Sequence, residues 1–359
     1  MAAYTTIDNP ELYFQVVIWT GNGTDDRSIT LPGETDMQPD MVWVKSRGNS
    51  DSHRLVDAIR GATKTLLPDD TNGEGTEANI IQAFESDGFQ VGSDNNSNRS
   101  SGTFVAWCWK AGTAFTNDAS ATSVGSIDST GSKNTTSGFS IVSYTGNGTA
   151  NQSVAHGLGA TPQFIIIKNR STSGYWPVTN PRFVSVSDPN MVYLQVNAAE
   201  ADDTNINGTT APSSTVFGVD DYGAVNTSGD NHIAYCFAEK QGYSSFKSYT
   251  GSGNADGPFI YTGFRPAFLI IKCVGALGNW LVFDNKRSTF NQIDGDYLEA
   301  DANSAEVTTS SAVDLDFLSN GFKMRNTSDA INKSGTKYIY MAFAEAPFVN
   351  SNGVPCNAR

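Results

Sequence analysis

Charged side chains are scarce in this sequence of 359 residues, and basic residues are fewer than acidic ones. Asp, Glu, Lys and Arg together make up 17% of the chain, and the formal net charge at pH 7 is −14. Most of such a surface would repel a phosphate backbone. The composition therefore argues against a nucleic acid as partner.

Long apolar runs and a secretory signal are missing as well. The longest apolar runs, residues 164–167 and 268–271, have the length of a β-strand, whereas a membrane-spanning helix needs about 18 or more apolar residues. Residues 1–15 contain no basic segment followed by an apolar one. The sequence thus predicts synthesis in the cytoplasm and no insertion into a membrane.

Cysteines and metal-binding spacings are also few. The four cysteines cannot form a disulfide framework in a chain of this length. Cys108, Cys236 and Cys273 lie in apolar segments, where cysteine acts as a small hydrophobic residue, and Cys356 lies in a polar tail. No CxxC, HxH or HExxH spacing occurs, so we expect no metal or other cofactor held by Cys or His.

Gly, Ser, Thr and Asn are abundant, and they separate short apolar segments roughly every 8–12 residues, which is typical of an all-β protein. One pattern occurs three times. Each copy opens with a glycine-rich turn, interpreted as a hairpin turn, and continues with a Pro, an apolar run ending in Lys, an Arg and a closing apolar strand. The recurring landmarks are the turns at residues 20–24, 145–149 and 250–254, the lysines Lys45, Lys168 and Lys272, and the arginines Arg60, Arg182 and Arg287.

The closing strands alternate large and small residues. In the second copy Ile233, Tyr235 and Phe237 can share one face, while the intervening Ala and Cys residues share the other. The apolar runs at 164–167 and 268–271 do not alternate, so we expect them to be buried on both faces, as in the inner layer of a sandwich.

The repeat length of about 100 residues matches one two-sheet β-sandwich. We therefore predict an all-β fold of three tandem antiparallel β-sandwich repeats, lectin-like or jelly-roll-like. The long polar spacer after the first copy predicts a flexible or draped linker, with the second and third copies as a rigid tandem and the first placed more independently. The predicted units are a 1–12 N-terminal arm, a 13–111 first repeat, a 112–137 Ser/Thr/Gly-rich linker, a 138–240 second repeat, a 241–348 third repeat and a 349–359 C-terminal tail.

Three stretches of this sequence resemble a known group of proteins. They are the opening AYTTIDNPELYFQVVIWTGNGT, the segment GLGATPQFIIIKNR, and the repeated closures IAYCFAE and IYMAFAE. They are similar to virion-associated proteins of tailed bacteriophages, especially those of phages that infect marine bacteria and cyanobacteria. Such repeats occur there in tail-fibre or other surface structural proteins. The resemblance spans residues 13–348 and implies a β-sandwich architecture, a place in the virion after synthesis in the host cytoplasm, and a structural or host-attachment role.

The resemblance supplies no catalytic residue. Glycoside hydrolysis needs two carboxylates about 5–10 Å apart. The acids at a repeated strand end are Glu239 and Glu345, which belong to different copies, and the first copy ends in WCWKA in place of FAE. We expect each of these residues to cap a turn or pair with the Lys of its own copy.

The recurring cations are expected to stabilise the fold. Lys45, Lys168 and Lys272 end buried strands, where we expect the aliphatic part of each side chain to pack and the ammonium head to reach water. For the three recurring arginines, an ion pair or stacking contact is favoured over contact with a ligand.

Aromatic residues in loops raise the question of sugar binding, because a flat ring stacks on the apolar face of a pyranose. Trp176 and Trp280 occupy matched positions after the apolar runs, and their apolar neighbours favour a place in the core. Tyr175 is the better candidate for an exposed platform. The three residues Tyr175, Trp176 and Trp280 are the candidate glycan contacts.

Calcium is the one metal that the sequence brings into question. The acidic loops at residues 68–77 and 294–301 could bind Ca²⁺ through clustered carboxylates, although Ile81 stands where the closing Glu of a calcium loop would fall. Solvated surface loops are the favoured interpretation.

These observations predict a non-enzymatic bacteriophage structural protein, as a tail fibre, spike or surface decoration. Its expected partners are other virion proteins and a host surface polysaccharide. The alternative is a carbohydrate-active depolymerase on the same scaffold. The closing strands AWCW, AYCF and YMAF carry almost no charge, and bare strand edges invite pairing. The sequence therefore predicts a homo-oligomer, with a trimer favoured.

Overall fold

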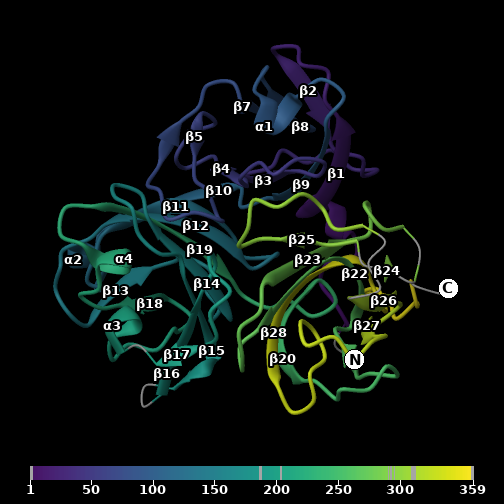
Figure 1. The fold of residues 1–359 in the computed structure, drawn as a ribbon. Coiled ribbons are helices and arrows are strands. Elements are labelled where there is room, and N and C mark those ends of the chain that lie inside the picture. Colours follow the sequence, from purple (N-terminus) through teal and green to yellow (C-terminus); the bar gives the residue numbers. More distant parts are fainter. Residues whose placement is uncertain are drawn as a thin grey trace.

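The computed structural model describes residues 3–185, 188–202, 204–289, 291, 293–294, 296–308 and 313–356. This part of the chain consists almost entirely of antiparallel strands in packed sheets, which confirms the all-β sandwich prediction. Three lobes meet around a common centre, one for each third of the chain (Figure 1). We call them the first, second and third sandwich.

The first sandwich follows the short 3-10 helix η1 (Pro10–Leu12) and carries the helix α1 (Asn95–Asn98) and the small pair β5 (Lys64–Thr65) and β6 (Gly75–Thr76). Its inner sheet has the order β1 (Phe14–Thr20), β9 (Thr103–Trp109), β3 (Met41–Ser46), β4 (Arg54–Asp57). Its outer sheet has the order β2 (Arg27–Thr30), β8 (Gly88–Val91), β7 (Ile81–Glu85).

The second sandwich has the longest inner sheet and three short helices, α2 (Ala119–Thr122), α3 (Thr204–Asn207) and α4 (Gly223–Asn226). Its outer sheet pairs β13 (Gln152–Ala155) with β18 (Val216–Val219). The inner sheet has the order β10 (Thr113–Asn117), β11 (Ser129–Asn134), β12 (Phe139–Thr145), β19 (Asn231–Phe237), β14 (Phe164–Asn169), β15 (Pro177–Ser185), β16 (Asp188–Tyr193), β17 (Ala201–Asp202).

The third sandwich repeats the scheme. Its inner sheet has the order β20 (Ser244–Thr250), β28 (Lys337–Pro347), β22 (Phe264–Cys273), β23 (Trp280–Asp284), β25 (Leu298–Glu299). Its outer sheet has the order β21 (Phe259–Tyr261), β27 (Gly321–Met324), β26 (Asp314–Leu318), β24 (Ile293–Asp294).

The closing strands β9, β19 and β28 are central strands of their inner sheets, flanked on both sides by hydrogen-bonded neighbours. In β19 the predicted alternation is present. Ile233, Tyr235 and Phe237 point to the centre of the molecule, and the Ala and Cys residues between them pack against the outer sheet of the same sandwich. The small residues thus allow a close approach of the outer sheet within one sandwich.

The three inner sheets share one aromatic core at the centre of the molecule. The ring of Trp109 lies 6.5 Å from that of Phe237 and 5.7 Å from those of Phe268 and Phe343, centroid to centroid. One side chain of the first sandwich therefore contacts both others. The expectation that the first copy is placed more independently is wrong, because its large residues are buried by the other two sandwiches.

Residues 112–137 differ from the flexible spacer that their composition suggested. They contain β10 and β11, which continue the inner sheet of the second sandwich beyond β12 in an unbroken antiparallel register. A side chain at Gly131 would lie 2.0 Å from the carbonyl oxygen of Ile141, so glycine permits this pairing. The composition is polar because most of β10 faces solvent, not because the segment lacks structure.

The N-terminal arm packs against the third sandwich of its own chain. Thr5 Oγ1 donates to the carbonyl of Gln241 at 2.8 Å, the Tyr4 hydroxyl donates to the carbonyl of Gly263 at 3.0 Å, and Ile7 enters the central core. The arm thereby connects the first and third sandwiches.

Candidate functional site: the junctions between the sandwiches

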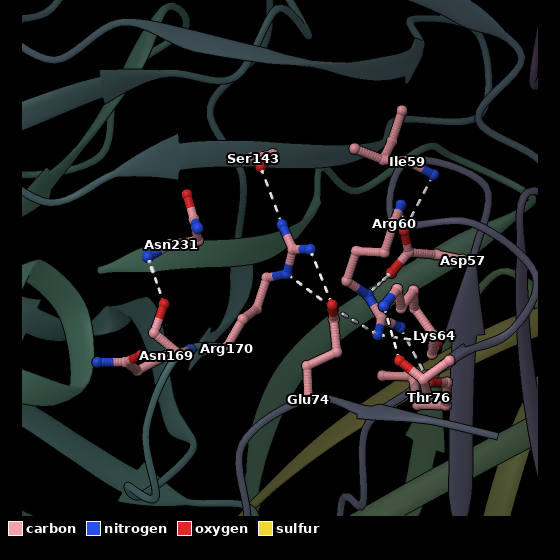
Figure 2. A network of polar contacts seen from close by, with 12 residues as sticks. Asp57, Ile59, Arg60, Lys64, Glu74, Thr76, Ser143, Asn169, Arg170 and Asn231 are labelled. Carbon is pink, nitrogen blue, oxygen red and sulfur yellow. Dashed lines mark hydrogen bonds and ion pairs between the residues drawn. The ribbon is translucent and has the colours of Figure 1, made fainter. Parts of the chain in front are cut away.

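A network of charged side chains lies where the first sandwich meets the second (Figure 2). Asp57 ends β4, and Arg60 follows three residues later with its Nε donating to Asp57 Oδ2 at 2.5 Å. The hydroxyl of Tyr235, on the closing strand of the second sandwich, donates to the same Oδ2 at 2.7 Å. Main-chain N–H groups of Ile59 and Arg60 donate to the other carboxylate oxygen at 3.1 and 3.0 Å.

Glu74 extends this network to the end of β14. Arg170 Nε donates to Glu74 Oε2 at 2.7 Å and its NH2 group to Oε1 at 3.1 Å, while Arg60 NH1 lies 3.4 Å from Oε2 (Figure 2). One carboxylate of the first sandwich thus bridges an arginine of each sandwich. Glu74 N also donates to the carbonyl of Arg170 at 2.8 Å.

The same arrangement joins the third sandwich to the first. Arg287 Nε donates to Asp284 Oδ2 at 2.6 Å, and the indole N–H of Trp107 donates to the same oxygen at 3.0 Å. Glu306 bridges Arg287 at 2.8 Å and Arg47 at 2.7 Å. Arg47 follows Lys45 by two residues, as Arg170 follows Lys168.

The junction of the second and third sandwiches keeps the backbone contact, and its ion pair joins Glu200 to Lys337 at 3.8 Å instead of to an arginine. Glu200 N donates to the carbonyl of Val274 at 2.9 Å, as Glu74 N does to that of Arg170. Val274 stands where the other junctions have an arginine, and Met341 stands where they have Tyr235 or Trp107; both are buried in the central core. The side chain of Arg182, the third recurring arginine, lies outside the described residues.

The electrostatics of the networks favour a structural role. Burial opposes the charged form of Arg60, but the adjacent Asp57 more than compensates and raises the pKa of the guanidinium. Burial also raises the pKa of Tyr235 well above its usual value, so its hydroxyl stays a donor. The Arg60 guanidinium therefore stays charged and the Tyr235 hydroxyl neutral, an arrangement that holds two sandwiches in register. The expected ion-pair role of Arg60 and Arg287 agrees with these contacts.

The recurring lysines lie deeper than predicted. Lys45, Lys168 and Lys272 are fully buried, so the expectation that their heads reach water is wrong. Lys168 Nζ donates to the carbonyls of Gly174 and Thr71, each at 2.7 Å, and Thr71 belongs to the first sandwich. Burial lowers the pKa of each of these lysines to about 8. Main-chain carbonyls replace water around the ammonium groups.

The candidate glycan contacts separate into two kinds. Trp176 and Trp280 are buried, and their indole N–H groups donate to the carbonyls of Asp70 and Tyr193, each at 2.9 Å. Neither ring has a free face for a sugar, because both are packed at the junctions. Tyr175 is 45% exposed. Of the three candidates, the structure leaves only Tyr175 accessible.

The two recurring strand-end glutamates lie in local contacts. Glu239 Oε2 accepts from the main-chain N–H of Phe246 at 3.2 Å, and Glu239 pairs with Lys247 at 3.3 Å. Glu345 pairs with Arg265 at 2.6 Å. The cap on the N–H of Phe246 agrees with the expectation, but neither acid pairs with the recurring Lys of its own copy, because Lys247 belongs to the third sandwich and the partner of Glu345 is an arginine.

The acidic residues of the 68–77 loop also have protein partners. Asp69 accepts from the main-chain N–H of His53 at 3.0 Å, and Glu77 pairs with Arg54 at 3.1 Å. In the described parts of the chain, no three His, Cys, Asp or Glu side chains are grouped so that they could hold a metal ion. Part of the 294–301 loop lies outside these parts. The preference for solvated loops over Ca²⁺ binding stays a prediction.

Three buried asparagines form a recurring contact that the sequence interpretation missed. Asn226 accepts from the N–H of Asn147 at 2.9 Å and donates to the carbonyl of Thr149 at 2.8 Å, clamping the TGNGT segment. Asn98 and Asn332 clamp the other two glycine-rich segments in the same way. These segments are therefore not hairpin turns, because each passes from an inner to an outer sheet. The repeated triplets NRS, NTS and NKS were the signal.

Comparisons with known proteins give one family and one distant structure. A family model described as "Domain of unknown function (DUF7483)" matches residues 9–347, which include all three sandwiches. No curated protein matches the chain. The major capsid protein P2 from Bacteriophage PM2 is 14% identical over 57% of this chain and 95% of its own, with a TM-score of 0.17, too low to indicate a shared fold. No helix in the described residues is long and apolar enough to cross a membrane.

Proposed function

This chain belongs to the family of the domain of unknown function DUF7483, and we propose that it is a non-enzymatic structural protein of a tailed-bacteriophage virion, as a tail fibre, spike or surface decoration. The observation that carries the proposal is the use of the buried charges. Asp57, Arg60 and Glu74, with their counterparts Asp284, Arg287 and Glu306, join separate sandwiches into one block.

The geometry suits a rigid building block. Each sandwich contacts the next through the same surfaces, and the three head-to-tail junctions close into a ring within one chain. The inner sheets are buried at the centre, so the outer sheets and the loops remain for contact with neighbouring proteins. The sequence resemblance to virion proteins of tailed phages over residues 13–348 supports the same role.

Assembly with other proteins needs a different basis from the one that the sequence suggested. The argument for a trimer assumed bare closing strands, but β9, β19 and β28 are central in their sheets. The inner sheets of the first and third sandwiches instead end at β1 and β20, whereas β11 covers the equivalent edge of β12. We propose that the chain associates with itself or with other virion proteins through these two edges.

Purified phage particles test the proposal directly. Quantitative mass spectrometry of particles banded on a density gradient should find this chain at a constant ratio to the major capsid protein. Antibodies against the folded chain should label one location on intact particles in electron micrographs. Presence of the chain in infected-cell lysate but not in purified particles would contradict a virion role.

The non-enzymatic part needs a separate assay. Incubation of the purified chain with host surface polysaccharide should release no new reducing ends over a day at neutral pH. Saccharide release that depends on the folded chain would overturn this part of the proposal and favour the depolymerase alternative.

A further inference from the structure

A hollow opens on the surface at the junction of the first and second sandwiches. Its walls come from the loop after β5, from the loop between β14 and β15, and from α4 and its flanking residues. Side chains with hydroxyl groups dominate the lining, contributed by Thr71, Thr172, Ser173, Tyr175, Tyr222 and Thr227.

The hollow is held open by contacts between the two sandwiches. Gly174 N donates to the carbonyl of Thr71 at 2.8 Å, and Ser173 Oγ donates to Thr71 Oγ1 at 3.1 Å. Beneath the rim, Lys168 Nζ donates to carbonyls on both sides. A ligand would therefore meet a preformed surface, which lowers the entropy cost of binding.

Tyr175 provides an aromatic platform in this hollow. Its side chain is 45% exposed, and its ring packs against that of Tyr193 with centroids 4.8 Å apart. This packing restricts the ring to one orientation while leaving part of it accessible. A flat, fixed, half-exposed ring suits stacking against the apolar face of a sugar.

The lining has no formal charge. All of its residues are Thr, Ser, Gly, Tyr or Ala, in a chain whose net charge is −14. The Lys168 ammonium, just below the rim, is directed to main-chain carbonyls. A phosphorylated or carboxylated ligand would lose hydration here without an opposing charge, whereas a neutral polyol would exchange water for hydroxyl and carbonyl partners.

We propose that this hollow binds a neutral carbohydrate, with Tyr175 stacking against one hexose ring and the hydroxyls of Thr71, Thr172 and Ser173 contacting its hydroxyls. The inference rests on the proposed function, since a virion protein would meet such a sugar on the host surface. It assigns the ligand class and the site.

Glycan binding by the full chain tests the inference. The probe is an array of neutral gluco-, galacto- and manno-oligosaccharides printed beside their carboxylated and sulfated counterparts, with hits confirmed by saturation-transfer NMR. We expect binding to neutral members only. Tyr175→Ala should weaken binding at least about tenfold, the size of effect expected for loss of an aromatic stacking contact. Binding to no neutral member, or a preference for charged members, would overturn the inference.

A blocking variant and a matched control make the test specific. A Cβ at Gly174 meets no atom within 4 Å, so Gly174→Leu should fold normally and fill the hollow, abolishing binding. Tyr261→Ala removes another tyrosine, 49% exposed, from the third sandwich and should leave binding unchanged. Unchanged binding in Gly174→Leu, with an unaltered melting temperature, would refute the site. Particle localisation separates the two proposals, because a virion location without sugar binding overturns only this one.

Discussion

The hydroxyl of Tyr235 donates a hydrogen bond to Asp57 across the junction of two sandwiches, 178 positions apart in the chain. At the junction of the third and first sandwiches, an indole N–H from Trp107 makes the equivalent bond to Asp284. The donor differs in chemistry, but the acceptor is in both cases an Asp paired with the Arg three residues later. In each buried ion pair, the Asp carboxylate thus accepts a further hydrogen bond from the neighbouring sandwich.

The first prediction concerns this ion pair. Asp57→Asn removes the nearer of the two acidic partners of Arg60, whose side chain is fully buried, and leaves Glu74, 3.4 Å away and shared with Arg170, as its remaining counter-ion. Breaking a buried pair in this way costs about 3–5 kcal/mol of unfolding free energy. Urea denaturation at pH 7 measures the loss.

Asp256→Asn is the control for that variant. Asp256 pairs with Lys323 on the surface, and its side chain is 78% exposed. An exposed pair contributes about 0–1 kcal/mol, so this variant should differ little from the unmodified chain. Equal losses of unfolding free energy in the two Asn variants would show that the buried junction pair contributes no more to stability than an exposed pair.

The second prediction follows from the shared core. Trp109 is 1% exposed and contacts rings of both other sandwiches, so Trp109→Ala should lower the unfolding free energy by about 3–5 kcal/mol. All three sandwiches should still unfold together, because unfolding of one sandwich exposes the inner sheets of the other two to water. Coincident transitions by circular dichroism and tryptophan fluorescence check this. Two separated transitions would mean that the sandwiches are independent units.

Stability at acid pH should depend on His53. Burial lowers the pKa of this imidazole to about 3, and the Nδ1 atom accepts a hydrogen bond from the indole N–H of Trp43 at 2.9 Å. The folded chain keeps the ring neutral, while the unfolded chain protonates it near its ordinary pKa of about 6.5. The unfolded state then binds more protons, so stability falls as the pH falls from about 6.5 towards 3.

His53→Gln isolates that contribution. Between pH 7 and pH 4 the melting temperature of the variant should fall less than that of the unmodified chain. Some loss should remain, because burial also lowers the pKa of His156 and of His232 to about 4. Identical pH profiles for the two proteins would contradict the assignment.

The buried lysines predict a rise in stability at mildly alkaline pH. Burial lowers the pKa of Lys45, Lys168 and Lys272 to about 8, below the ordinary value of 10.5. Between about pH 8 and pH 9 the unfolded state therefore binds more protons than the folded state, and unfolding becomes less favourable as the pH rises. Above about pH 9 the thiols of Cys108, Cys236 and Cys273 act oppositely, because burial raises the pKa of each. Above pH 10 the buried tyrosines act oppositely, because burial raises the pKa of Tyr144 and Tyr235 well above 10.

Lys168→Met tests one of the three lysines. Thermal melts from pH 7.5 to 8.5, below the range in which the cysteines titrate in the unfolded chain, should show a smaller rise in this variant, by about one third, because one of three similar groups is lost. A half-buried lysine whose ammonium group lies at the surface provides the control. Lys64→Met should keep the full rise, since Lys64 donates to Thr76 at an exposed site.

Much of the local structure could be predicted from the sequence. The unbroken run in β14 is buried along its whole length, and the alternation of Tyr235 with its small neighbours in β19 defines two distinct faces. These predictions succeed because a strand places successive side chains on opposite faces, so the order of the residues indicates which side chains are buried. The exposure of Tyr175 also follows from its place in a polar loop.

Errors arose where contact with a distant segment decides the structure. The burial of Trp176 followed from its apolar neighbours, but its hydrogen-bond partner did not, since the carbonyl that accepts its N–H belongs to Asp70, 106 positions away. The 112–137 segment has the composition of a linker, and only the open edge of β12 makes it a pair of strands. Lys168 is buried because carbonyls of two sandwiches converge on its ammonium group.

The sequence by itself determined that a closing strand such as β19 has one face of large and one of small residues. It could not determine what covers the large face. The tertiary structure decided that three such faces cover one another, with Trp109, Phe237 and Phe343 in mutual contact and with Asp57 placed against Tyr235. The physical reason is that the hydrophobic effect is not directional, so a period-two pattern shows which face of a strand is buried but not which surface covers it. Shape complementarity and the few buried charges at the junctions decide that.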